Sequence, residues 1–238
     1  MEQRLSNVCA QNVLMLKKPK CVLSYSGGKD STLALYHMLQ TAEPVALIAM
    51  LEEQGQRSRS HGMDTDLIAA QAQALGLPII TAAASWQDYE AKFAEVLQSC
   101  QQQGIAVLAT GDLDVPAVGS WHEQMAQAAG LELSMPLLQQ PHQAVVDEFI
   151  ALGFLAIVVT VNLSLGMWPE DLGRHFDREF VQELQARGID VAGEGGEFHT
   201  TVVDGPIFSQ PLNVRQGERV YHGEYGFLPL FVNTTTEE

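Results

Sequence analysis

The first half of the chain alternates short, uninterrupted apolar runs with longer segments in which apolar residues recur every three or four positions. An uninterrupted apolar run is typical of a parallel strand covered on both faces, and the longer spacing is typical of a helix. Strands are expected to begin at Val22 and to cover residues 44–51, 77–81 and 105–109, with helices after Ser31 and over residues 66–75 and 88–102. This alternation predicts an α/β fold with a doubly wound, mainly parallel sheet.

The pattern changes after Gly130, where residues 131–136 are expected to connect to a second region. That region is predicted to contain helices at residues 143–152 and 170–187, a buried strand at 154–161, and a small antiparallel layer with strands at 198–203, 213–221 and 225–232. The apolar stripe of the longer helix is expected in the core, and consists of Phe176, Phe180, Val181 and Leu184. We therefore expect two domains, residues 1–132 and a smaller α+β substrate-binding region, residues 133–238.

A polar stretch, Ser26-Gly27-Gly28-Lys29-Asp30-Ser31, separates the first expected strand from the first expected helix. Adjacent glycines let the backbone pass close to a bulky anion, and a helix start directs free N–H groups and its positive dipole end at the loop. Asp30 and Ser31 stand where a helix N-cap is expected. The spacing is neither that of a Walker A loop nor that of a dinucleotide fingerprint. We predict a phosphate cradle, with candidate nucleotide-binding residues Ser24, Ser26, Gly27, Gly28, Lys29, Asp30 and Ser31.

The loop at residues 52–62 is expected beside this cradle, because loops that follow strand ends line the ligand crevice of a doubly wound sheet. Arg57, Arg59 and His61 concentrate cationic groups in it. Such groups fit an anionic substrate, and they fit a solvated loop equally well.

The stretch Thr110-Gly111-Asp112 follows the fourth expected strand. Gly111 can allow an adenine or ribose to approach the backbone closely. Asp112 or Asp114 can assist with magnesium, although an acidic helix cap is an equally ordinary explanation for either carboxylate.

A second glycine-rich stretch, Gly193-Glu194-Gly195-Gly196-Glu197-Phe198-His199, lies in the C-terminal region. Three glycines in four positions make a backbone that can wrap a ligand, and Glu197 and His199 share one face if the chain is extended there. Carboxylates at such a site can hold an amine, act as a base or share a magnesium ion. A glycine-rich hairpin with exposed acids is the plain alternative.

Composition narrows the class of protein. The 238 residues are 46% hydrophobic and only 18% charged, which is typical of a globular protein. The polar start and the lack of a long apolar run predict a soluble, cytoplasmic protein without a membrane segment. A net charge of −16 argues against a nucleic-acid substrate. Cys9, Cys21 and Cys100 form no Cys-x-x-Cys pair, so neither a disulfide framework nor a zinc site is expected. Whether the chain forms a homodimer is left open by the sequence.

The two glycine-rich stretches together resemble one known family. Ser-Gly-Gly-Lys-Asp-Ser is the motif of the PP-loop ATP pyrophosphatases, which cut ATP between its α and β phosphates. Gly-Glu-Gly-Gly-Glu-Phe narrows the resemblance to the diphthine–ammonia ligase-like ATP-binding proteins, over residues 20–208. Residues 71–78, 110–112, 130–132 and 203–208 agree with that family as well.

This resemblance implies that ATP adenylates a carboxylate, that pyrophosphate leaves, and that ammonia then forms an amide and releases AMP. The implied cofactors are ATP and Mg²⁺, and the implied acceptor is a small carboxylate compound or a diphthine-bearing elongation factor. The candidate catalytic residues are Asp30, Glu194 and Glu197; the candidate metal ligands are Asp30 and Asp112; and Thr110, Gly111 and Asp112 join the nucleotide site. The candidate substrate-binding residues are Arg57, Arg59, His61, Gly195, Gly196 and His199.

Three positions depart from what similar ligases tend to carry, namely Arg59, Trp121 and Leu138. These departures leave the identity of the acceptor open. A different class of function is also open, because a phosphate cradle alone predicts binding and not chemistry. On that alternative the chain is a nucleotide-binding sensor or regulatory module of the same fold, without turnover.

Overall fold

The computed structural model describes residues 18–59, 62–116 and 118–233. Its first half is built on a parallel sheet with the strand order β3-β2-β1-β4-β5. The strands are β1 (Lys20–Ser24), β2 (Glu43–Leu51), β3 (Ile79–Ala83), β4 (Val107–Ala109) and β5 (Glu132–Ser134). Successive strands are added on both sides of β1, so the predicted doubly wound α/β fold is confirmed.

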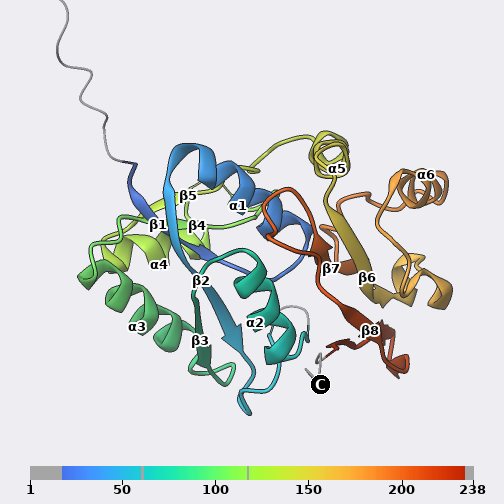
Figure 1. Cartoon of the computed structure of the whole chain (residues 1–238), viewed down its shortest axis with the longest axis horizontal. Helices are drawn as coiled ribbons and strands as arrows, with labels where there is room; N and C mark the ends of the chain where they lie inside the picture. The colour runs from blue at the N-terminus through green and yellow to red at the C-terminus, as the bar shows by residue number, and fades with distance from the viewer. Residues whose placement is uncertain (1–17, 60–61, 117, 234–238) are drawn as a thin grey trace, which may run out of the picture.

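Helices cover both faces of this sheet (Figure 1). The covering helices are α1 (Lys29–Thr41), α2 (Thr65–Ala74), α3 (Tyr89–Gln102) and α4 (Trp121–Ala129). Side chains of β1 alternate between the faces, because Cys21 and Leu23 pack in the core cluster with α1 and α2, whereas Val22 packs in the cluster with α3 and α4. The fully buried strands explain the uninterrupted apolar runs of the sequence.

The described residues of the C-terminal half add antiparallel sheets, two further α-helices and two short 3-10 helices, beside the parallel sheet in Figure 1. Its α-helices are α5 (His142–Ala151) and α6 (Arg178–Ala186). Its strands are β6 (Leu155–Asn162), β7 (Phe198–Asp204), β8 (Val214–Gln216), β9 (Val220–His222), β10 (Tyr225–Phe227) and β11 (Leu230–Val232). They form one sheet of order β7-β6-β10-β9 and a separate β11-β8 pair.

Strand β7 attaches this half directly to the first glycine-rich loop. The amide of Val202 donates to the carbonyl of Gly27 at 3.0 Å. The fully buried Gln71 of α2 donates its Nε2 to that same carbonyl at 2.9 Å and to the carbonyl of Val202 at 2.7 Å. One core cluster then runs from α1 through β7 to α6, so the two halves share buried apolar surface.

Four expectations about local structure need correction. Residues 131–136 contain β5, which joins the edge of the parallel sheet, rather than being only a connection. Residues 170–187 do not form one helix, because Gly173 takes a left-handed φ of 88° and the backbone of residues 173–176 makes hydrogen bonds with β6. Helix α6 begins only at Arg178.

The two long C-terminal strands are each divided into two short ones, with Gly217 and Pro229 at the interruptions. The N-cap of α1 is Gly28, with Asp30 and Ser31 already in the first turn.

The remaining expectations about the core are confirmed. Phe176, Phe180, Val181 and Leu184 are all buried. Cys21 and Cys100 are buried free thiols, and burial raises the pKa of Cys21 to about 11, while Cys9 lies outside the described residues.

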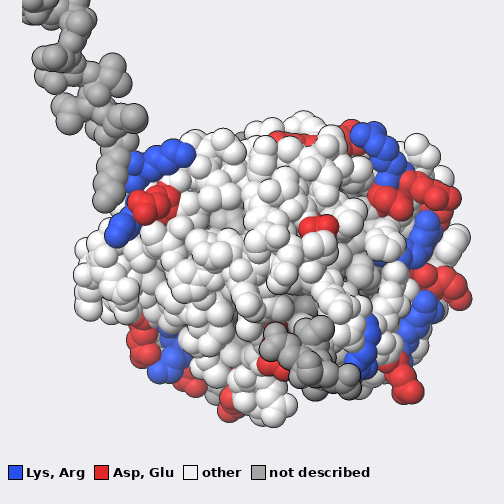
Figure 2. Space-filling view, in the orientation of Figure 1, with Lys and Arg blue, Asp and Glu red and all other residues white. Residues whose placement is uncertain are grey.

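Lys and Arg side chains on the face drawn in Figure 2 lie beside Asp and Glu rather than forming a patch of one sign. Within the described part of the chain, no helix is long and apolar enough to cross a membrane.

Candidate functional site

The candidate site lies where the strand order reverses, between the neighbouring strands β1 and β4. The helices that follow them, α1 and α4, cover opposite faces of the sheet, which leaves a crevice at the strand ends. A cavity of about 350 Å³ opens there. Among the predicted residues it is lined by Ser24, Ser26, Lys29, Asp30, Ser31, Thr110, Gly111, Asp112, Glu194, Gly196 and His199. The structure therefore brings the two glycine-rich stretches and the loop after β4 to one place.

The loop after β1 is tightly constrained. Gly27 has a φ of 79°, and a Cβ on it would lie 2.4 Å from Oε1 of Gln71. Glycine is required here by backbone conformation and by packing, and its partners are protein groups. The hydroxyls of Ser26 and Ser31 lie 3.1 Å apart across the loop, and the amide of Gly28 donates to Ser26 at 3.4 Å. These hydroxyls and the first turn of α1 present several donors to the cavity.

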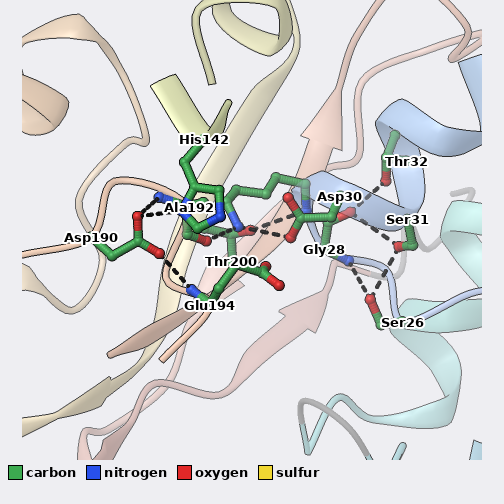
Figure 3. Close-up of polar contacts among 11 residues, drawn as sticks. Ser26, Gly28, Asp30, Ser31, Thr32, His142, Asp190, Ala192, Glu194 and Thr200 are labelled. Carbon is green, nitrogen blue, oxygen red and sulfur yellow. Dashed lines mark hydrogen bonds and ion pairs between the residues drawn. The ribbon is translucent and has the colours of Figure 1, made fainter. Parts of the chain in front are cut away.

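Lys29 and Asp30 connect this loop to the second glycine-rich stretch. The Lys29 ammonium lies 2.7 Å from Oδ2 of Asp30 and donates a second hydrogen bond to the carbonyl of Ala192. Both partners, Asp30 and Ala192, are labelled in Figure 3. Lys29 is only 6% exposed, so two of its three donors are already committed inside the protein. The buried Oδ1 of Asp30, in contrast, has no hydrogen-bond partner among the described residues. An acceptor that can receive a donor or a cation is thus present at the cavity wall.

The loop after β4 packs against the start of α1. A Cβ on Gly111 would lie 2.7 Å from the backbone of both Asp30 and Ser31, so this glycine is needed for backbone contact within the protein. Asp112 accepts a hydrogen bond from Thr110 at 2.7 Å and pairs with Nδ1 of His122 at 2.8 Å. Burial opposes ionisation of Asp112, but the hydrogen bond and charge of His122 outweigh burial and lower the pKa of this carboxyl. Asp112 is therefore an ionised carboxylate whose position is fixed by Thr110 and His122.

The second glycine-rich stretch forms the opposite wall. Glu194 as a whole residue is exposed, but partial desolvation of its carboxyl, followed by the charge of Asp30, raises its pKa to about 7. Burial, followed by the charge of Lys29, lowers the pKa of His199 to about 4, so this imidazole is neutral at pH 7. Gly195 and Glu197 do not line the cavity, and the Glu197 carboxylate lies against Gly195 instead. The stretch thus offers one carboxyl that changes charge near neutral pH.

The cationic loop is placed differently from the expectation. Arg57 pairs with Asp64 at 3.3 Å and lines a separate apolar cavity of about 210 Å³. The guanidinium of Arg59 lies 4.2 Å from the ring centre of Trp86 and donates to the carbonyl of Ala84. Neither arginine lines the 350 Å³ cavity, and His61 lies outside the described residues. Only Ser58 of this loop reaches the main cavity among the described residues.

Several cavity residues have no recognisable motif in the sequence. His122 reaches the cavity from α4, Tyr89 from α3, and Ile48 and Met50 from the end of β2. Ser120 caps α4 by accepting from the amide of Glu123 at 3.2 Å, and the Ser120-Trp121-His122 start of that helix is the one local signal that points to His122. In the sequence, the apolar residues of β2 indicate only a buried strand.

The comparisons with known proteins agree with this geometry. Residues 19–133 match the family model described as the diphthamide synthase N-terminal domain, and residues 141–234 match the diphthamide synthase C-terminal domain. The chain belongs to the diphthamide synthase family. It is 24% identical to the mouse diphthine–ammonia ligase and 23% identical to the human one, each over 86% of both chains. The bovine diphthine–ammonia ligase is 30% identical over 45% of this chain and 42% of its own.

Membership in the diphthamide synthase family confirms the resemblance that the two glycine-rich motifs predict. It also confirms the class of protein, an ATP-dependent ligase, at the level of the family. The two matched regions contribute opposite walls of one cavity, since Ser26 to Ser31 lies in the first and Glu194 to His199 lies in the second.

Proposed function

We propose that this chain activates a carboxylate with ATP, releases pyrophosphate, and transfers ammonia to the activated acyl group to give an amide and AMP. The observation that carries the proposal is one cavity in which the glycine-rich loop after β1 faces the second glycine-rich stretch, with the carboxyl groups of Asp30, Asp112 and Glu194 in its lining. Family membership supports the same reaction. The acceptor is a carboxylate compound, and diphthine on an elongation factor is the first one to test, because it is what the relatives' name states.

The loop after β1 is the proposed site for the departing pyrophosphate. The hydroxyls of Ser26 and Ser31 and the first-turn amides of α1 are donors that can stabilise charge as the α–β phosphate bond breaks. Lys29 adds positive charge near them while it stays bonded to Asp30 and Ala192. We therefore assign Lys29 mainly to holding the two walls together.

Magnesium fits the carboxylates beside this loop. Mg²⁺ in nucleotide sites is commonly held by one or two carboxylates, with substrate phosphates and water completing its shell. Asp30, with an unpartnered Oδ1, and Asp112, held as a carboxylate by Thr110 and His122, would hold it. The ion would neutralise charge on the phosphates as pyrophosphate forms.

Glu194 is the proposed base for the second step. The nitrogen of ammonia bonds to the acyl carbon and must lose a proton as AMP leaves with the electron pair of the acyl–oxygen bond. A base is most effective when its pKa lies near the working pH, and the pKa of Glu194 is about 7. Glu197 is the poorer candidate, since it does not line the cavity.

The deciding experiment incubates the protein with MgATP, an ammonium salt and either a panel of carboxylates or diphthine-bearing elongation factor. We expect pyrophosphate release to require the acceptor, and sustained AMP formation to require both acceptor and ammonia, together with the mass change of a carboxylate converted to an amide. ADP and phosphate as products would refute the proposal. Tight ATP binding without AMP formation for any acceptor would favour the nucleotide-binding sensor instead.

A matched pair of variants links the activity to the site. Asp30→Asn removes a carboxylate from the cavity wall, and we expect it to abolish AMP formation. Asp147→Asn makes the same change on the exposed face of α5, where Asp147 accepts only from Gln143 among the interactions that the structure describes, and should leave activity unchanged. Equal activity of the two variants would exclude Asp30 from the reaction.

A further inference from the structure

His142, the first residue of α5, bridges two carboxylates. Its Nδ1 lies 2.8 Å from Oδ1 of Asp190, and its Nε2 lies 3.0 Å from Oδ1 of Asp114. Ionised carboxylates only accept hydrogen bonds, so both ring nitrogens must carry a proton for both contacts to form. Because Asp114 belongs to the loop after β4 and Asp190 follows α6, His142 ties together two segments that are far apart in the sequence.

Asp190 passes this restraint on to the glycine-rich stretch. Its carboxylate accepts hydrogen bonds from the amide of Ala192 at 3.2 Å and from the amide of Glu194 at 2.9 Å. The carbonyl of Ala192 in turn accepts from the Lys29 ammonium. Figure 3 shows this chain of contacts running from His142 to the start of α1. The turn that carries Glu194 is therefore held at two points, at Asp190 by His142 and at Ala192 by Lys29.

His142 itself does not line the 350 Å³ cavity. Any influence on the reaction must act through the groups it holds. The loop of Asp114 also carries Thr110, Gly111 and Asp112 at the cavity, so the bridge connects the loop after β4 with the turn that carries Glu194. Displacement of a reacting group by about 1 Å can cost a hundredfold in rate, which makes such a restraint consequential.

We propose that His142 is a positioning residue for the amide-forming step, holding the turn of Glu194 against the loop that follows β4. This inference rests on the proposed ligase function for its kinetic consequence. Its structural consequence, an ordered turn at residues 190–194, is independent of any turnover.

The test compares His142→Gln with a matched control, His37→Gln. Glutamine is uncharged and cannot donate to both carboxylates as the imidazolium does. His37 of α1 pairs with Glu148 of α5 at 3.2 Å, has a similarly exposed side chain, and lies outside the cavity. Hydrogen–deuterium exchange on the full chain, without substrates, reports the amides of Ala192 and Glu194 directly.

We expect His142→Gln to lower the exchange protection of these amides by about two- to tenfold, which is the effect expected from losing one hydrogen bond of this kind. We expect His37→Gln to leave their protection unchanged. In turnover, His142→Gln should lower kcat by about ten- to a hundredfold, with the KM for ATP within about twofold of wild type. Equal protection in the two variants overturns the proposal, and so does a KM for ATP that rises as much as kcat falls.

A second variant keeps the test decisive if His142→Gln does not fold. Asp114→Asn removes one end of the bridge while His142 and Asp190 remain, so we expect a smaller loss of kcat, again without a change in the KM for ATP. Wild-type kcat in Asp114→Asn contradicts the proposal. If no acceptor supports AMP formation by the wild type, the ligase function fails, and the exchange comparison alone decides whether His142 orders the turn.

Discussion

Gly111 offers the sharpest test of how the site is built. Its hypothetical Cβ would lie 2.7 Å from the carbonyl carbon of Asp30 and 2.7 Å from the amide nitrogen of Ser31. Ordinary van der Waals contacts begin at 3.4 Å, so Gly111→Ala requires the two backbones to separate by several tenths of an ångström. Both opposing atoms belong to the backbone of the first turn of α1, so no side-chain rotation can relieve the contact.

The expected cost follows from overpacking. Forcing a methyl group into a packed site costs about 1–3 kcal/mol. For a chain of this length each kcal/mol lowers Tm by about 2–4 °C, so we expect Gly111→Ala to lower Tm by about 2–12 °C. Because the shift also displaces the first-turn amides of α1, we expect affinity for MgATP to fall by about tenfold, equivalent to about 1.4 kcal/mol.

Thermal unfolding with and without MgATP, and calorimetric titration, measure both quantities. Gly195→Ala is the matched control for stability, since its Cβ would meet only the carboxylate end of the flexible Glu197 side chain, at 2.7 Å. We expect its Tm to stay near that of the wild type. If Gly111→Ala unfolds at the wild-type Tm and binds MgATP equally well, the close backbone contact between the β4 loop and α1 is refuted.

Three further outcomes are expected. Gln71→Leu should destabilise the chain by about 1–3 kcal/mol, as measured by urea unfolding, because the Val202 carbonyl loses the Gln71 donor, whereas the Gly27 carbonyl keeps the Val202 amide. Phe180→Ala should cost about 3–5 kcal/mol in the same assay, because this ring is fully buried in the shared core. The pKa of Glu194 rises from 4.5 to about 7 on folding, so the folded state binds more protons in this range and its stability falls as pH rises from 4.5 to 7. Glu194→Gln lacks this titration, so its free energy of unfolding should increase relative to that of the wild type over the same pH range. A difference between the two proteins that does not change with pH would contradict the raised pKa.

The sequence is informative where backbone geometry demands particular residues. Gly27 needs a left-handed φ, and Gly111 needs the absence of a Cβ, so both positions carry a glycine that can be recognised in the sequence itself. The buried strands likewise produce uninterrupted apolar runs, because both faces of the parallel sheet are covered. The sequence does not identify what Gly111 contacts, however: a nucleotide is the expected neighbour, whereas the structure places the protein backbone of Asp30 and Ser31 there.

Side chains that act through distant partners produce no such pattern. His122 and His142 are single residues near helix starts, and their carboxylate partners lie 10 to 48 positions away in the chain. Arg59 is expected from its charge to face an anion, but aromatic stacking against Trp86 occupies its guanidinium. Charge content alone cannot distinguish these uses, because each depends on which elements the fold brings together.

The same dependence on distant partners predicts how the chain unfolds. Sequence patterns divide it near residue 132, and two family models match its two parts. One core cluster, however, contains Leu33 of α1, Val202 of β7 and Phe180 of α6, so separating the parts would expose apolar surface on both. The hydrogen bonds of Gln71 cross the same junction. We therefore expect one calorimetric transition for the whole chain, with equal calorimetric and van't Hoff enthalpies. Two resolved transitions would show that the parts fold independently, and that the cavity between them is held by its few polar contacts alone.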